Sequence, residues 1–361
     1  MGRACISAVA TKVPWYLVDM DRFTDFHVLG WWLTEEEKRF CKKVIPKTMI
    51  RTKYWSVKPF DYFSENGRPK FVDHTNRQLD WRTDTTLMCS VVASELLKNT
   101  STDLISFNST TGWANPDIPA KVAASLGLGH YIRRTQILGQ GCYAAIPNLV
   151  RCAEAVMSGM SKKALMLAGE LCSYTFQPHT KDKGYLISTI LFGDGVAGAI
   201  IEEDGLFEII DYETYTDYET FKEMSFELEH EGFRFVLTDA VPGILGEKIL
   251  GPIERLTERN NLGIHDVYWL IHPGGMAIVK NICKTMNIKM PRETLSVNRN
   301  FGNMSSATIM FVLKNFIDNS LKSFDRNDHI GLITFGPGLT IETMLLRVCG
   351  NEQDESMDNS G

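Results

Sequence analysis

Cys142, His272 and Asn303 are the residues of this sequence whose types and settings are best suited to covalent and acid–base chemistry. Cys142 follows the glycine turn GQG (139–141), and a helical pattern begins at the cysteine. A thiol at a helix N-terminus lies at the positive end of the helix dipole, which favours the nucleophilic thiolate. Most cysteines are small buried residues, but a glycine turn that leads into a helix favours a nucleophile here.

His272 and Asn303 each allow a structural interpretation beside a chemical one. His272 ends the apolar run WLI (269–271) and precedes PGG (273–275), so it lies at a strand-to-helix turn. This setting suits either a core histidine or an acid–base group. Asn303 precedes a helical pattern, and asparagine is a preferred N-cap, so capping is the simpler role when this residue is considered alone.

The elements that must position these residues alternate between short apolar strands and helical patterns. Strands are expected at 4–10, 103–108, 135–138, 164–168, 196–202, 207–212, 267–271, 294–297, 329–334 and 342–348. Helices are expected at 34–44 (with a Thr34/Glu37 capping box), 84–97, 117–126, 142–157, 244–260, 275–286 and 303–321. This order predicts an α/β fold of two similar halves with parallel strands and crossover helices. Ligands of such sheets bind beyond the carboxyl ends of the strands, where all three candidate residues fall.

The composition excludes several classes of protein. The 361 residues are 44% hydrophobic and carry a net charge of −6, which argues against a general nucleic-acid binder. Eight cysteines without a CxxC pair are typical of reduced thiols in a cytoplasmic protein, and not of a disulfide framework or a metal site. No uninterrupted apolar run reaches the roughly 18 residues of a membrane helix.

Six motifs, in the same order along the chain, resemble those of the thiolase-fold condensing enzymes, and among them the type III polyketide synthases (the chalcone and stilbene synthase family). They are GQGCYAA (139–145), LFGDGVA (191–197), VPGIL (241–245), HPGGMA (272–277), GNMSSA (302–307) and FGPGLTIE (335–342). The stretch MIRTKY (49–54) is similar to the MIKxRY stretch of that family. The resemblance covers about residues 3 to 348.

The resemblance implies a thiolase-like fold, in which two pseudo-symmetric βαβαβαββ halves form a five-layer αβαβα arrangement. Residues 1–205 would form the half that carries the nucleophilic cysteine, and residues 206–350 the half that carries the histidine and asparagine. The polar, acidic tail 351–361 is expected to be disordered. A homodimer is also implied, with the strand 135–138 and the loop 110–116 near the twofold axis.

The resemblance also implies a role for each motif residue. Cys142 matches the nucleophile that carries the acyl group. His272 and Asn303 match the pair that binds the thioester carbonyl and stabilises the enolate. Phe192 and Phe235 match the two phenylalanines between the access tunnel and the cavity. A trio linked to the choice of cyclisation is matched by Thr110, Glu170 and Ser305. The loop Gly336, Pro337 and Gly338 would supply a backbone N–H that holds an oxyanion.

Acyl thioesters arrive on a phosphopantetheine arm, so a basic entrance to the site is expected. The candidates for this entrance are Lys42, Lys43, Lys47, Arg51 and Lys53, with Arg133 and Arg134 as a second group. An ordinary solvated surface is the alternative. The substrates implied are acyl-CoA, malonyl-CoA or acyl-carrier-protein thioesters, with an acyl carrier protein as a candidate partner. No metal or other cofactor, nucleic acid or membrane is expected.

The resemblance therefore predicts an acyltransferase that forms carbon–carbon bonds by Claisen condensation and then cyclises the product, for example to a pyrone or a resorcinol. Some positions depart from the plant pattern: residues 110–117 look nearer to acyl-carrier-protein synthase III, and Ser188 and Tyr143 replace the commoner Gly and Phe. Such a synthase, releasing a β-ketoacyl thioester after one condensation, is the first alternative. A Cys-His-Asn hydrolase or acyltransferase is the second, and a non-catalytic partner subunit the third.

Overall fold

The computed structural model describes residues 2–22, 33–62, 73–177, 182–229 and 232–350. The tail 351–361, expected to be disordered, lies outside these ranges. Within them, none of the helices is both long and apolar enough to cross a membrane.

Nine strands form one sheet with the order β11-β12-β13-β8-β1-β7-β6-β4-β5. The N-terminal half supplies β1 (Cys5–Lys12), β4 (Leu104–Ser109), β5 (Arg133–Leu138), β6 (Lys163–Leu171) and β7 (Asp194–Glu202). The C-terminal half supplies β8 (Phe207–Thr216), β11 (Val267–Ile271), β12 (His329–Gly336) and β13 (Thr340–Val348). Only Cys5 and Ile6 of β1 pair with β8, so the sheet consists of two parts joined by a short contact. Strands β4, β5 and β6 are parallel to one another, as are β11 and β12.

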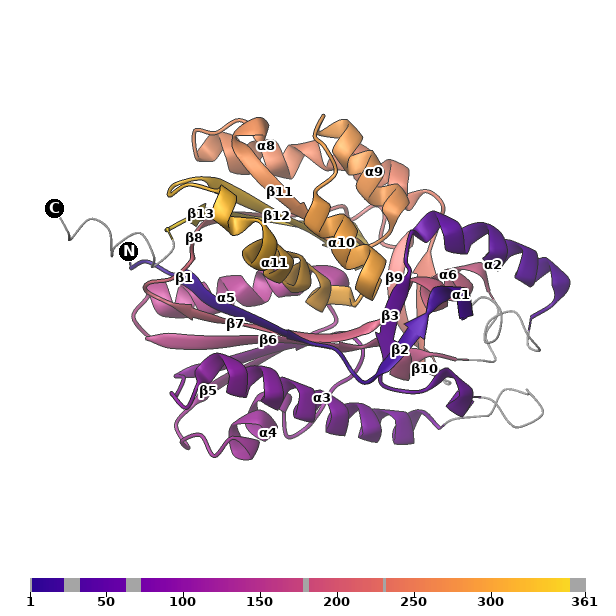
Figure 1. Cartoon of the computed structure of the whole chain (residues 1–361), viewed down its shortest axis with the longest axis horizontal. Coiled ribbons are helices and arrows are strands. Elements are labelled where there is room, and N and C mark those ends of the chain that lie inside the picture. The colour runs from indigo at the N-terminus through magenta and orange to yellow at the C-terminus, as the bar shows by residue number, and fades with distance from the viewer. Residues whose placement is uncertain (1, 23–32, 63–72, 178–181, 230–231, 351–361) are drawn as a thin grey trace.

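Helices cover the outer face of each sheet part and fill the space between the two parts. Helices and sheet parts together form the five layers that were predicted (Figure 1). On the outside of the N-terminal part lie α3 (His74–Leu97) and α4 (Ile118–Ser125). Between the two parts lie α5 (Ala145–Met157) and α11 (Thr308–Asn319), whose apolar side chains form a buried core with both. On the outside of the C-terminal part lie α7 (Val241–Lys248), α8 (Leu250–Arg259) and α9 (Met276–Thr285). Burial of apolar surface on both sides of each sheet part stabilises this arrangement.

The two halves differ at one edge. The predicted strand 294–297 is wrong, because these residues belong to helix α10 (Arg292–Phe301). Its buried side chains are Glu293, Thr294, Val297 and Asn298, and their spacing of three and four residues is that of a helix face. The C-terminal part of the sheet therefore has no counterpart of β5.

Two helix boundaries that concern the site also differ from the prediction. Cys142 lies in a 3₁₀ turn, Gly141–Tyr143, that precedes α5. Asn303 lies before a second 3₁₀ turn, Ser305–Ala307, and the N-cap of α11 is Ala307. Neither residue begins an α-helix, so neither is an N-cap.

Three smaller elements that the sequence patterns did not indicate surround the site. They are the antiparallel pair β2 (Tyr16–Asp19) and β3 (Thr52–Trp55), the hairpin β9 (Met224–Glu229) with β10 (Gly232–Leu237), and helix α6 (Lys183–Leu191). The short helix α1 (Met20–Arg22) follows β2, and α2 (Glu35–Thr48) has the predicted capping box of Thr34 and Glu37.

Candidate active site

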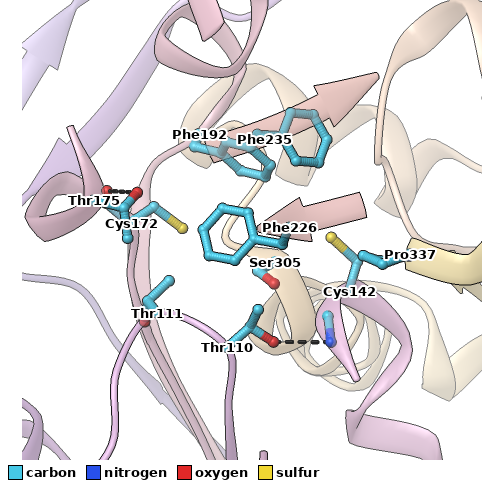
Figure 2. Close-up of a pocket in the computed structure, with 11 residues that line it drawn as sticks. Thr110, Thr111, Cys142, Cys172, Thr175, Phe192, Phe226, Phe235, Ser305 and Pro337 are labelled. Atoms are coloured by element: carbon cyan, nitrogen blue, oxygen red, sulfur yellow. Dashed lines mark hydrogen bonds between the residues drawn. The ribbon is translucent and has the colours of Figure 1, made fainter. Parts of the chain in front are cut away.

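The turn that carries Cys142 is held from two sides. The Gly141 N–H donates a hydrogen bond to Thr110 Oγ1 at 2.8 Å (Figure 2). Gly141 has φ +69°, and a Cβ atom there would lie 2.4 Å from Cδ of Pro337. A Cβ atom on Gly336 would likewise lie 3.1 Å from the Cys142 nitrogen, so the loop 336–338 packs directly against the cysteine turn. Glycine is required at position 141 by both conformation and space.

The environment of the Cys142 thiol combines burial with hydrogen-bond partners. Burial raises the pKa of Cys142 to about 12, whereas hydrogen bonds with the side chains of Ser305 and Asn303 act to lower it. The charge of Glu170 raises it further. The thiol is thus neutral at pH 7 in the absence of a nearby positive charge.

His272 is completely buried at the end of β11, and neither of its ring nitrogens has a hydrogen-bond partner among the described residues. Its backbone N–H donates to the Ile333 carbonyl at 2.8 Å, and its ring meets that of Phe335 edge-on at 5.4 Å. Burial lowers the pKa of His272 to about 3. Buried polar atoms without partners are rare in folded proteins, so this imidazole is a candidate hydrogen-bonding group of the site, although it does not line the pocket beside Cys142.

Asn303 is fixed by both its backbone and its side chain. Its N–H donates to the Leu191 carbonyl and its carbonyl accepts from the Gly193 N–H, both at 2.9 Å. Its Oδ1 accepts a hydrogen bond from the Ser305 N–H at 2.8 Å, which leaves the amide nitrogen as the outward donor. That nitrogen lies 3.4 Å from the Gly274 carbonyl, two residues after His272. Asn303 therefore lies between the cysteine turn and the histidine.

A small apolar pocket opens beside Cys142. Its cavity measures about 20 Å³, and the residues that line it are Thr110, Thr111, Gly141, Cys142, Cys172, Thr175, Phe192, Phe226, Phe235, Ser305 and Pro337. Phe192 and Phe235, the two predicted phenylalanines, meet edge-on with ring centroids 5.2 Å apart. Figure 2 shows the ring of Phe226 among these residues, between the thiols of Cys172 and Cys142.

Phe226 and Cys172 were not predicted as site residues. Phe226 pairs with Phe235 across the β9–β10 hairpin. The alternation of apolar and polar residues in these two adjacent short strands could have indicated Phe226 as a neighbour of Phe235. A second hollow on the surface shares Thr110, Phe226 and Pro337 with the pocket. Phe226 therefore belongs to the lining of both spaces.

The Glu170 carboxylate is the acceptor shared by several polar groups next to the pocket. Its Oε2 accepts hydrogen bonds from the Thr110 N–H and from the N–H and hydroxyl of Thr111, and its Oε1 accepts from the Ser306 hydroxyl. Burial raises the pKa of Glu170, and these hydrogen bonds oppose the rise. Within the predicted trio, the Glu170 carboxylate therefore binds the backbone N–H of Thr110. The third member, Ser305, contacts Cys142 and not Glu170.

The structure separates the basic residues of the predicted entrance. Lys42 and Arg51 line one surface groove together with Arg299, whereas Lys43 and Lys47 are exposed outside it. Lys53, by contrast, has no exposed surface, so its prediction as an entrance residue is wrong. In the second group, Arg133 donates to Ser161 and Arg134 forms an ion pair with Asp117.

Comparison with known proteins adds an independent line of evidence. The sequence matches the N-terminal domain of chalcone and stilbene synthases over residues 1–205 and their C-terminal domain over residues 218–349. It is 25% identical over 360 residues to a chalcone synthase homologue of Bacillus subtilis, which covers 95% of this chain and 98% of the relative.

Solved structures share the fold at low sequence identity. The polyketide synthase PKS-I of the brown alga Ectocarpus siliculosus has a TM-score of 0.88 at 21% identity, covering 96% of this chain and 98% of the alga's. The tetrahydroxynaphthalene synthase of Streptomyces coelicolor, a bacterial type III polyketide synthase, has a TM-score of 0.88 at 20% identity, covering 96% of this chain and 100% of that one. The type III domain of Steely1 from Dictyostelium has a TM-score of 0.85 at 22% identity, with the same coverage.

Proposed function

Because this chain belongs to the chalcone and stilbene synthases, condensing enzymes of the acyltransferase class, we propose that it joins acyl thioesters through an acyl group carried on Cys142. The observation that supports this most is the arrangement around Asn303. The Ser305 N–H fixes the amide oxygen of Asn303, and the amide nitrogen donates to the Gly274 carbonyl, two residues after His272, while the side chain also contacts Cys142. A pre-oriented donor of this kind is what a developing enolate requires.

Loading of the enzyme is the first step. The Cys142 sulfur attacks the carbonyl carbon of an acyl thioester, a carbon–sulfur bond forms, and the bond to the departing thiol breaks. The proton of Cys142 passes to His272 and then to the departing thiolate. A Cys142–His272 ion pair would hold the thiolate before attack, but burial disfavours both charges, since it raises the pKa of the thiol and lowers that of the imidazole. The ion pair therefore stays a prediction.

Condensation is the second step. A malonyl thioester loses CO₂, and its electron pair forms an enolate whose oxygen accepts hydrogen bonds from His272 and from the Asn303 amide. The enolate carbon then attacks the acyl group on Cys142, so that a carbon–carbon bond forms and the cysteine is released. We assign the backbone N–H for the second oxyanion to the loop 336–338, because this loop packs against the Cys142 turn. These steps use side chains, backbone and thioester substrates only.

Three phenylalanines line a cavity of only about 20 Å³ beside Cys142, so the pocket must widen to admit an acyl chain, and a long extended chain fits least well. We therefore propose a cyclic product, such as a pyrone or a resorcinol, and not a long linear chain. The Lys42, Arg51 and Arg299 groove is the candidate contact for the phosphates of coenzyme A or of a carrier protein's phosphopantetheine arm.

Mass spectrometry of the enzyme and of its products tests this function. Incubation with short acyl-CoA thioesters should add one acyl mass to the peptide that contains Cys142, and malonyl-CoA should then give a cyclised product. Cys142→Ala should abolish both, at a cost of several orders of magnitude in rate. Cys172→Ala, which removes the other thiol of the pocket, is the matched control and should still load.

Each alternative function gives a different product. Release of a linear β-ketoacyl thioester would indicate a single condensation, as in acyl-carrier-protein synthase III. Release of the free acid alone would indicate a hydrolase, and an acyl group on Cys172 would contradict the assignment of Cys142.

A further inference from the structure

Strand β3 lies beside the two backbone segments that carry Phe192 and Asn303, which are bridged directly to each other, and the chain at β3 bonds to both. On one side, the Arg51 N–H donates to the Arg299 carbonyl at 2.8 Å and the Thr52 hydroxyl donates to the Asn300 carbonyl at 2.8 Å. These two carbonyls lie at the end of α10, three or four residues before Asn303. On the other side, β3 meets the C-terminus of α6.

The last carbonyls of a helix have no donors within the helix and need partners from elsewhere. Lys53 Nζ donates to the carbonyls of Thr189 and Ile190, at 2.5 and 3.1 Å, and the Trp55 indole N–H donates to that of Phe192 at 3.1 Å. We call Lys53 and Trp55 the carbonyl clamp. The remaining carbonyl of this run, at position 191, accepts from the Asn303 N–H at 2.9 Å.

The same segments approach too closely to move independently. A Cβ atom on Gly302 would lie 2.8 Å from the oxygen of the 191 carbonyl and 3.6 Å from Cβ of Lys53. A Cβ atom on Gly193 would lie 2.6 Å from the oxygen of the 301 carbonyl and 3.2 Å from Cβ of Lys53. Because no gap separates them, a displacement of β3 or of the end of α6 is transmitted to Asn303.

Burial of a lysine side chain in this space has a desolvation penalty. Lys53 has no exposed surface, and burial lowers its pKa to about 7, although the charge of Asp194 opposes this shift. Asp194 accepts hydrogen bonds of its own, from the Ser56 N–H and from the N–H and hydroxyl of Ser173. An apolar side chain of equal length would avoid the desolvation of the ammonium, whereas lysine contributes its bonds to α6 and a cation–π contact 4.8 Å from the ring centroid of Trp55.

We propose that Lys53 is a positioning residue for the condensation step, because the carbonyl clamp holds Asn303 where its amide can reach an enolate beside Cys142. This inference rests on the proposed function. The cysteine turn is held by Thr110 and Pro337, not by β3. Loss of the clamp should therefore impair enolate formation and spare acyl loading.

Lys53→Met and Trp55→Phe each remove a donor of the clamp and keep most of the side-chain volume. We expect both to load Cys142 at the wild-type rate, while kcat for decarboxylation of malonyl-CoA falls about 10- to 100-fold through misplacement of Asn303. Lys53→Arg, which keeps a cationic donor, should recover part of that loss. Trp269→Phe is the matched control, since it removes an indole N–H bond to the Ile264 carbonyl, 2.8 Å long, and should leave both steps unchanged.

Two results would overturn the inference: normal decarboxylation in folded Trp55→Phe and Lys53→Met enzymes, or a loss of loading as large as the loss of decarboxylation. A crystal structure of either variant gives a test that needs no activity, because the Asn303 Cα should move relative to Cys142. An unmoved Asn303 contradicts the inference. Wild-type enzyme that fails to decarboxylate malonyl-CoA would instead contradict the proposed function, and the crystal structure would still decide the role of the clamp.

Discussion

At the scale of single residues, burial has opposite effects on the two groups that must share a proton. It raises the pKa of Cys142 to about 12 and lowers that of His272 to about 3, so each group is driven toward its neutral form. A thiolate requires compensation from donors, and Asn303 and Ser305 are the donors already in contact with the thiol. The chemistry therefore depends on how firmly Asn303 is held.

Asn303→Asp separates the structural role of this residue from its chemical role. Aspartate keeps the oxygen that accepts from the Ser305 N–H, so the melting temperature should stay near wild type. It replaces the amide donor by a carboxylate, which repels an enolate, and loss of one such donor costs roughly 2.7–4 kcal/mol of transition-state stabilisation. Loading of Cys142 does not pass through the enolate, so it should fall much less than condensation, although the carboxylate also removes a donor to the thiol. Normal condensation by this variant would leave His272 as the only side-chain donor of the proposal.

Lys53 should make stability depend on pH in a defined direction. Its pKa is about 7 in the folded protein, against an ordinary value of 10.5. Between these values the unfolded chain holds a proton that the folded chain lacks, so a rise in pH stabilises the folded state. The effect is fully developed only above the ordinary value and is absent below about pH 7.

Urea unfolding of wild type and Lys53→Met between pH 7.5 and 9.5 measures this effect. The difference in unfolding free energy, wild type minus variant, should rise by at most about 1.4 kcal/mol per pH unit. Taking the difference cancels the other groups that titrate in this range. A constant difference would show that Lys53 keeps an ordinary pKa.

The residues that carry motifs were predictable from the sequence, whereas those that depend on burial were not. Glycine turns and the order of the motifs indicated Cys142, His272 and Asn303, and the structure places Asn303 in contact with Cys142 and with the Gly274 carbonyl, two residues after His272. Lys53 was predicted to be a surface cation because a lysine near other lysines usually is one. Its burial follows from packing against α6, which no local pattern records.

At the scale of elements, the turn that leads into α5 determines where the nucleophile lies. Gly141→Ala adds a methyl group that would overlap the ring of Pro337 and also forces alanine into a left-handed conformation. We expect a loss of Cys142 loading and a drop in unfolding free energy of about 2–4 kcal/mol, from strain and overpacking together.

Gly139→Ala is the control for conformation alone. Gly139 has φ +79°, but a Cβ atom there would meet no other atom within 4 Å. This variant should lose only about 1–2 kcal/mol and should load at close to the normal rate. Equal losses of loading in the two variants would show that the contact with Pro337 is unimportant.

Helix α10 shows why one element could not be predicted from a short run. Residues 294–297 are mostly apolar and β-branched, which favours a strand when four residues are considered alone. Over ten residues the buried positions repeat at helical spacing, and a buried Glu293 accepts a hydrogen bond from the Tyr268 hydroxyl at 2.8 Å. The resemblance to a duplicated fold also favoured a strand here, and the two halves differ at this position.

At the scale of the whole molecule, the N-terminal part of the sheet ends in β5, whose outer edge has no paired strand among the described residues. Leu138 at its end and Trp113 in the nearby loop are 44% and 58% exposed, so this edge offers apolar side chains to a partner. Together with the family membership, this supports the proposal of a homodimer with this edge near the twofold axis.

Light scattering at micromolar concentration should give twice the mass of one chain. Leu138→Lys together with Trp113→Lys should shift the equilibrium toward monomer by placing like charges across the axis. Tyr131→Lys, at a side chain that is 99% exposed on another loop, is the control and should not change the mass. A monomeric wild type, or a double variant that stays dimeric, would contradict this interface.

The hairpin β9–β10 has a consequence for how such an enzyme can diversify. Phe226 and Phe235 enter the pocket from a two-stranded sheet that is separate from the nine-stranded one. The catalytic residues, by contrast, are tied to tightly packed glycine segments that tolerate little change. After gene duplication, mutations in the hairpin can alter the shape of the pocket while the inherited chemistry is preserved. Selection for new metabolites is therefore expected to leave its traces in residues 224–237 more than around the nucleophile.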